Sequence, residues 1–143
     1  KASAVLQKYP DVASRLIVEI SEYHLVSNLN ELKPVLAQLN RMGIQLLTDK
    51  VGQFVVGVQY LKNSHIDMMK LHRAIVRKIH EKPENQIFVQ SIKAMADDAN
   101  VFMYALGVET EEEWQTLIRL GVDGGQGHYF TEPQTLEQAS GQN

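Results

Sequence analysis

Polar side chains that could do chemistry recur at the ends of short β-rich segments of this sequence. These residues are Glu19, Glu22, Asp49, Lys50, Lys70, His72, Glu109 and, just before the last and weakest segment, Gln126. In a parallel β/α sheet the carboxyl ends of the strands meet on one face of the fold, so such side chains converge there. Carboxylates beside a lysine would suit Mg²⁺ or Mn²⁺ and a phosphate ester. The alternative is that these residues only cap and solubilise the loops, and their spacing does not decide between the two interpretations.

Two kinds of segment alternate along the chain and would position these residues. The β-rich runs span residues 16–21, 45–49, 66–71, 101–106 and, weakly, 128–130, and segments with helical periodicity lie between them. Alternation of strand and helix predicts a parallel sheet of the α/β class.

Two of the expected helices have clear starts. The first begins near Asn28 or Asn30, whose side chains can accept bonds from first-turn amides, and stops at Gly43. Pro34 is expected in its first turn, where a missing amide hydrogen costs little. Its apolar face is formed by Leu32, Val35, Leu36 and Leu39. The second helix is predicted over residues 83–96, which open with Pro-Glu.

A third helix is predicted from its capping residues. Thr110 is followed three residues later by Glu113, which is the pattern of a capping box, and Gly121 is a natural stop. Trp114 and Leu117 lie three apart and are expected to pack on the sheet.

Composition narrows the class of protein. The 143 residues include 14 Lys plus Arg against 17 Asp plus Glu, which disfavours a broad nucleic-acid surface, and no Cys, which removes disulfides and thiol catalysis. The basic cluster of Arg73, Arg77, Lys78, His80 and Lys82 is expected to be a solvated helix face, with an RNA contact as the alternative. No apolar run approaches the roughly 20 residues of a membrane helix, so we expect no membrane contact by this segment. The chain opens without an initiator Met, which suggests a piece of a longer protein.

Five short motifs follow one another along the chain. Each motif alone is a weak indication of a protein family, but the five in this order are a strong one. They are Glu19-Ile-Ser-Glu22, Gly43-Ile-Gln-Leu-Leu-Thr-Asp49, Ile66-Asp-Met-Met-Lys70-Leu, Ala105-Leu-Gly-Val-Glu109-Thr and Gln126-Gly-His-Tyr-Phe-Thr-Glu-Pro133. Together they resemble the later motifs of EAL domains, β/α-barrel phosphodiesterases of the bacterial messenger cyclic di-GMP. The resemblance implies a TIM-like barrel, which takes roughly 250 residues. We therefore expect residues 1–133 to be the carboxyl-terminal part of such a barrel, with about five β/α units, and residues 134–143 to be a polar tail.

The resemblance also implies roles for particular residues. Glu19 matches a metal ligand of the family, and Asp49 matches the first Asp of a pair that bridges two metals. Lys70 matches the Lys near the attacking water and phosphate. Glu109 matches a Glu that supports the loop after the Asp pair, and Gln126 matches the active-site Gln.

Departures from the family pattern fall on the same motifs. Lys50 replaces the second Asp of the pair, Leu106 replaces a metal-binding Glu, and His72 replaces an Asp. A two-metal site needs several anionic oxygens around ions about 4 Å apart. The resemblance therefore implies vestigial ligands, no required cofactor and little or no phosphodiesterase activity, with residual binding of one Mg²⁺ or Mn²⁺ ion left open.

Residues 69–72, 84–91 and 113–127 resemble more narrowly the CsrD/MshH group of degenerate members. This implies the cytoplasmic domain of an inner-membrane-anchored regulator, in some bacteria encoded beside genes for the mannose-sensitive haemagglutinin (MSHA) pilus. It also implies docking of the glucose-specific enzyme IIA of the phosphotransferase system and RNase E-dependent decay of the small RNAs that sequester CsrA. The alternative is a weak cyclic di-GMP phosphodiesterase or receptor.

An open sheet would leave unpaired edges, so we further expect the missing strands to come from other residues of the protein or from a homo-oligomer.

Overall fold

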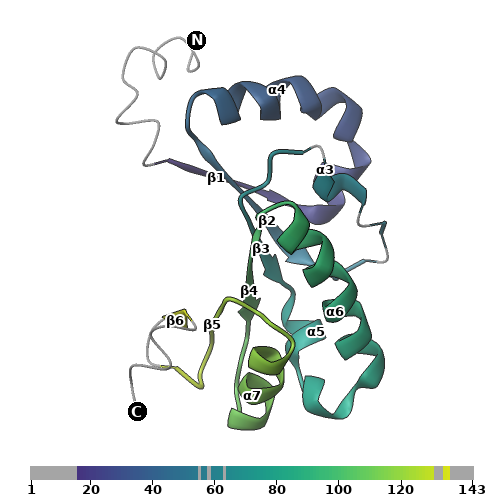
Figure 1. The fold of residues 1–143 in the computed structure, drawn as a ribbon, viewed down its shortest axis with the longest axis vertical. Coiled ribbons are helices and arrows are strands. Elements are labelled where there is room, and N and C mark those ends of the chain that lie inside the picture. The colour runs from purple at the N-terminus through teal and green to yellow at the C-terminus, as the bar shows by residue number, and fades with distance from the viewer. Residues whose placement is uncertain (1–15, 55, 58, 63, 131–133, 136–143) are drawn as a thin grey trace.

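A single mixed sheet forms the centre of the computed structural model, which describes residues 16–54, 56–57, 59–62, 64–130 and 134–135 (Figure 1). Its strands are β1 (Ile17–Ser21), β2 (Gln45–Val51), β3 (Met68–Leu71), β4 (Phe102–Leu106), β5 (Gly124–Gln126) and β6 (Gln134–Thr135). They follow one another in chain order; β1 to β5 are parallel and β6 is antiparallel to β5. The α/β class and the partial β/α barrel are confirmed.

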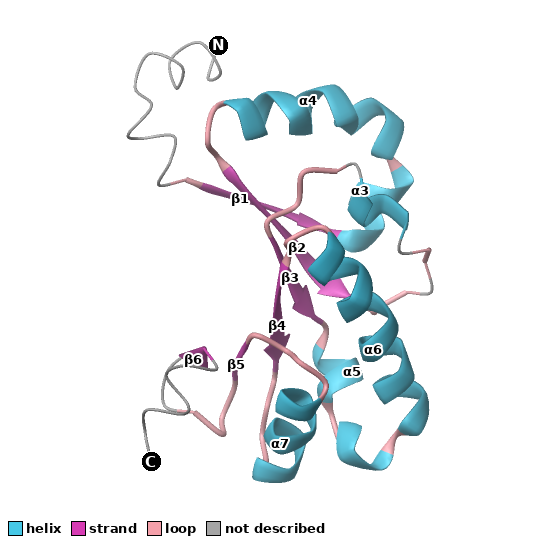
Figure 2. Cartoon of the chain, viewed as in Figure 1, coloured by secondary structure: helices cyan, strands magenta, loops and turns pink. Residues whose placement is uncertain are grey.

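The helices gather on one side of this sheet (Figures 1 and 2). They are α3 (Glu22–Ser27), α4 (Leu29–Arg41), α5 (Arg73–Val76), α6 (Pro83–Asp98), α7 (Glu111–Arg119) and the 3-10 turns η1 (Gln59–Lys62) and η2 (Ile79–Glu81). Strand residues facing them are fully buried, including Met69, Leu71, Met103 and Ala105. On the opposite face Phe102 is 59% exposed. That open face corresponds to the inside of a barrel.

The first predicted helix begins where expected but is built differently. Asn28 precedes α4 without a side-chain cap bond, and its amide group instead donates to the His24 carbonyl at the end of α3. The sequence predicted Pro34 in the first turn of this helix, and that prediction is wrong. Because α4 starts at Leu29, Pro34 lies further inside the helix. There it removes the amide that would bond to the Asn30 carbonyl.

The predicted strand at residues 128–130 is wrong. The chain instead forms β5 over Gly124–Gln126, so Gln126 ends a strand rather than preceding one. A Cβ on Gly125 would lie 2.8 Å from the Trp114 ring, so the close packing of α7 on β5 requires a glycine there. Glycine carries no strand propensity, which is why periodicity missed this strand.

The second and third predicted helices are confirmed as α6 and α7. In α6, Val89, Ile92 and Ala96 are buried on the sheet, while Ile87 is 62% exposed. Residues 134–143, predicted as a polar tail, begin with β6, and positions 136–143 lie outside the described residues.

Candidate functional site at the carboxyl ends of the strands

Three of the predicted site residues lie on the open face of the sheet. Glu19 pairs in register with Leu47 of β2, and Leu47 pairs with Met68 of β3, two residues before Lys70. Paired residues, and residues two apart, point to the same face of a sheet, so Glu19, Asp49 and Lys70 share it. Lys70 Nζ lies 3.8 Å from Glu19 Oε1. The structure thus brings onto one face, across three neighbouring strands, side chains that are up to 51 positions apart in the sequence.

The backbone is irregular where Asp49 is followed by Lys50. The β2–β3 register shifts between Thr48 and Val51, and Lys50 has a φ of 54°. Such a bulge in a strand re-aims side chains, and a positive φ is costly for a residue other than glycine or asparagine. The Lys50 amide donates to Asp49 Oδ1 at 2.7 Å. One Asp49 oxygen is therefore already used by the backbone.

Carboxylates on this face are few for a dinuclear metal centre. Within the described part of the chain, no three His, Asp or Glu side chains are grouped closely enough to hold a metal ion. Glu19 is paired with Lys70, and the position after Asp49 carries a cation. The donor set that these residues provide does not fit a two-metal site.

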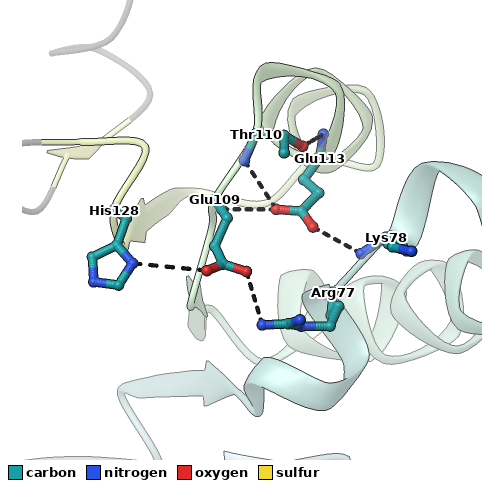
Figure 3. Close-up of polar contacts among 6 residues, drawn as sticks. All are labelled: Arg77, Lys78, Glu109, Thr110, Glu113 and His128. Atoms are coloured by element: carbon teal, nitrogen blue, oxygen red, sulfur yellow. Dashed lines mark hydrogen bonds and ion pairs between the residues drawn. The ribbon is translucent and has the colours of Figure 1, made fainter.

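A pocket of about 250 Å³ opens at the carboxyl ends of β4 and β5. Its lining residues are Arg73, Arg77, Leu106, Gly107, Glu109, Gln126, Gly127 and His128. Glu109 Oε2 accepts from Arg77 Nη2 at 2.9 Å, and Glu109 Oε1 lies 3.7 Å from His128 Nδ1 (Figure 3). The pocket therefore joins Gln126 and Glu109 with two members of the basic cluster predicted from the sequence. His72 lies just outside it and caps α5, its Nδ1 accepting from the Ala74 amide at 3.1 Å.

Glu113 ties this pocket to the rest of the fold. Its Oε1 accepts from the amides of Glu109 and Thr110 at 2.7 and 3.1 Å, and its Oε2 accepts from the Lys78 amide at 2.8 Å (Figure 3). The Thr110 side chain completes the predicted capping box. Burial alone would raise the pKa of Glu113, but the three amides and the charge of His80 together lower it. The carboxylate thus fixes the α5–η2 segment against the start of α7.

Replacing Glu113 with glutamine is expected to destabilise the domain by about 2 kcal/mol at neutral pH, because an amide has one acceptor oxygen for three donors. The folded pKa is lowered, so this stability is present above the ordinary value of 4.5 and is lost as the pH falls through the folded value. Urea unfolding of the full-length protein between pH 3 and 7 measures it. Glu112→Gln, an exposed change in the same helical turn, is the control; equal effects of the two changes would contradict this role.

Glu22 is a structural carboxylate whose role the sequence did not reveal. It is only 2% exposed, and it accepts from the Gly52 amide at 3.1 Å and from the Tyr60 hydroxyl. Burial raises the pKa of Glu22, and the two hydrogen bonds oppose that rise. Glu22 therefore supports the segment after β2, a role that the family resemblance assigned to Glu109. For Glu109 that role stays a prediction, since its described partners are Arg77 and His128.

Comparison with known proteins identifies the family. The family model described as EAL domain matches residues 2–133. The chain is 35% identical over 123 residues to the RNase E specificity factor CsrD of Escherichia coli, covering 86% of the chain and 19% of CsrD. It is 29% identical over 136 residues to the cyclic di-GMP phosphodiesterase PdeF of the same organism, covering 95% of the chain and 18% of PdeF.

Solved structures agree with this assignment. The PaMucR phosphodiesterase in complex with c-di-GMP is similar with a TM-score of 0.75 and 28% identity, over 89% of this chain and 51% of that one. Klebsiella pneumoniae BlrP1 in a manganese and cy-diGMP complex gives a TM-score of 0.77 and 29% identity, over 85% of this chain and 31% of that one. The chain spans about a fifth of the length of CsrD and of PdeF. Among the helices that the structure describes, none has the length and apolar character of a membrane-spanning helix. The chain belongs to the EAL domain family.

Proposed function

We propose that this chain is part of an EAL-type regulatory domain that does not hydrolyse cyclic di-GMP. The observation that carries the proposal is that two positions where the family resemblance implies metal ligands hold Lys50 and Leu106. Lys50 follows Asp49, and Leu106 lines the pocket beside Gln126.

Charge explains why these replacements matter. Exchanging Asp for Lys makes the ligand set more positive by two, and exchanging Glu for Leu by one. Two divalent ions held about 4 Å apart need anionic oxygens to offset their charge. Without the second ion, both the generation of hydroxide and the stabilisation of the leaving oxygen are impaired.

The regulatory role that we propose is protein docking. The domain would bind unphosphorylated glucose-specific enzyme IIA and promote RNase E-dependent turnover of the small RNAs that sequester CsrA. It would be the cytoplasmic part of an inner-membrane-anchored protein of the CsrD/MshH type. Such a protein would be linked to MSHA pilus biogenesis. Similarity to CsrD, an RNase E specificity factor, supports this. Contact with RNase E or RNA would be indirect. The missing strands of the barrel would come from other residues of the protein or from a second copy.

The full-length protein with Mg²⁺ or Mn²⁺ is expected to linearise cyclic di-GMP at least about a hundredfold more slowly than PaMucR, the size of effect seen when one transition-state contact is lost. Chromatographic detection of linear product measures it. The double variant Lys50→Asp, Leu106→Glu is expected to raise the rate, whereas Lys62→Asp, on an exposed turn, is not. Wild-type turnover at the PaMucR rate would refute the proposal.

A second candidate is a weak or single-metal cyclic di-GMP enzyme or receptor. It is favoured by Glu19, Asp49 and Lys70 sharing one face and by Gln126 in the neighbouring pocket. Calorimetric titration with cyclic di-GMP and, separately, with unphosphorylated enzyme IIA distinguishes the two candidates. Tight nucleotide binding without partner binding would favour the second one.

A further inference from the structure

The pocket at the carboxyl ends of β4 and β5 carries more positive than negative charge. Its lining includes two arginines, Arg73 and Arg77, and a single carboxylate, that of Glu109. Two positive charges against one negative charge leave a net charge of +1, or +2 when His128 is protonated. Leu106 stands in this lining where the family resemblance implies a Glu, whose charge would balance the second arginine. The excess positive charge therefore follows from Leu106 and not from the arginines alone.

The one carboxylate of this pocket is already engaged. Glu109 Oε2 accepts from Arg77 Nη2 at 2.9 Å, and Glu109 Oε1 lies 3.7 Å from His128 Nδ1 (Figure 3). The guanidinium of Arg73, by contrast, makes no hydrogen bond or ion pair with any residue that the structure describes. A Cβ on Gly107 would lie 2.9 Å from Arg73 Cβ, so the base of this side chain packs against the loop after β4. Arg73 thus lies at the pocket wall with a charge that no described carboxylate neutralises.

The size of the pocket limits the anion that could pair with Arg73. Its volume of about 250 Å³ is below the roughly 300–1,000 Å³ of sites for drug-sized ligands, so it fits one side chain better than a dinucleotide. A planar carboxylate can accept two parallel hydrogen bonds from one guanidinium, which is among the stronger polar pairings in proteins. Leu106, Gly107 and Gly127 line the same pocket and would contact the apolar stem of an acidic side chain.

Nucleic acid fits this surface less well than a single acidic side chain does. Exposed glutamates follow the pocket-lining residues along the chain, namely Glu81, Glu84, Glu111 and Glu112. Because nucleic acid is a continuous polyanion, a strand that crossed this surface would be repelled by these carboxylates. A single carboxylate in the pocket has only to pair with Arg73.

We propose that this pocket is the point at which the domain docks its protein partner, and that an aspartate or glutamate of the partner inserts its carboxylate beside Arg73. The inference rests on the proposed docking function and adds the surface and the chemistry of the contact. Arg77 and His128 have a positioning role, because they hold Glu109 and leave Arg73 to the partner.

Calorimetric titration of the full-length protein with unphosphorylated enzyme IIA tests the contact. Arg73→Gln changes an exposed side chain and is expected to weaken docking on the order of tenfold, because one charge-assisted pairing is lost. Leu106→Glu supplies a counter-charge inside the pocket and is expected to weaken docking to a similar extent. Lys78→Gln is the matched control, since Lys78 is an exposed member of the basic cluster that does not line the pocket. It is expected to bind as the wild type does.

Acetate, a free carboxylate, tests the pocket without the partner. Replacing chloride by acetate at constant ionic strength is expected to raise the thermal midpoint of the wild type more than that of Arg73→Gln. If enzyme IIA bound none of the proteins, the proposed function would be wrong, while an Arg73-dependent acetate effect would still support a carboxylate site.

Three results would overturn the inference. The first is equal affinity of the wild type and Arg73→Gln for enzyme IIA, which would leave docking intact but place it elsewhere. The second is an acetate effect that is the same in both proteins. The third is binding of cyclic di-GMP or of small RNA that depends on Arg73, which would assign the pocket to a phosphate.

Discussion

Replacing Gly127 with alanine is expected to destabilise the carboxyl end of the sheet by about 3 kcal/mol, through backbone strain and overpacking together. Gly127 has a φ of 149°, and a Cβ there would overlap the backbone N and O atoms of Val108. Val108 cannot retreat, because its amide donates to the Gln126 carbonyl at 3.1 Å and its carbonyl accepts from the Tyr129 amide at 3.0 Å. The change therefore breaks the contact between the β4 and β5 loops on which the pocket depends.

Hydrogen exchange in the full-length protein measures this effect. The amides of Val108 and Tyr129 are expected to lose protection in Gly127→Ala while those of β2 keep it. Gly57→Ala is the matched control, because a Cβ there meets nothing within 4 Å and its stability should change by no more than about 0.5 kcal/mol. Unchanged protection of Val108 in Gly127→Ala would show that the loop can move aside.

The local parts of the fold were predictable from the sequence because their signals are local. The capping box of Thr110 and Glu113 lies within four residues, and α7 begins where it predicts. By contrast, β5 depends on glycine next to the Trp114 ring, a contact between elements that no periodicity records. The position of Pro34 was mispredicted because α4 starts directly after Asn28, the earlier of the two candidate caps, which makes Pro34 the sixth residue of the helix.

The part of the site that follows from the order of the strands was predictable, and the part that depends on contacts between loops was not. Parallel neighbours bring Glu19, Asp49 and Lys70 to one face once their strands are identified, and the structure shows the Glu19–Lys70 pair. The partners of Glu109 come from loops after different strands, and nothing in the spacing of Arg77 and His128 indicates them. Side-chain pairing between loops depends on loop geometry, which sequence pattern does not encode.

Replacing Glu22 with alanine is expected to destabilise the domain by about 3 kcal/mol, because it leaves the buried Tyr60 hydroxyl and the Gly52 amide without their acceptor. The loss of structure should begin in the segment after β2, which contains Gly52. A Cβ on Gly52 would press on the Ile75 and Phe88 side chains, so this segment is also packed against α5 and α6 and has little room to find new partners. Hydrogen exchange at Gly52, with urea unfolding of the full-length protein, measures the effect.

Glu22→Gln separates the charge of this side chain from its shape. Burial raises the folded pKa of Glu22 above the ordinary value of 4.5, so the folded protein holds this proton more tightly than the unfolded chain does. Stability from this group therefore falls as the pH rises from 4.5 through the folded value and is constant above it. Glutamine does not titrate, so the stability of Glu22→Gln relative to the wild type should increase across that window.

Tyr60→Phe supplies the test of the cause. The Tyr60 hydroxyl bond opposes the effect of burial on Glu22, so its removal should raise the pKa of Glu22 further and extend the falling limb to higher pH. Urea midpoints of the three proteins between pH 4 and 8 give the comparison. If Tyr60→Phe left the limb unchanged, hydrogen bonding to Tyr60 would not control this carboxyl. The segment after β2 would then be held by the hydrogen bond of the Gly52 amide and by packing on α5 and α6.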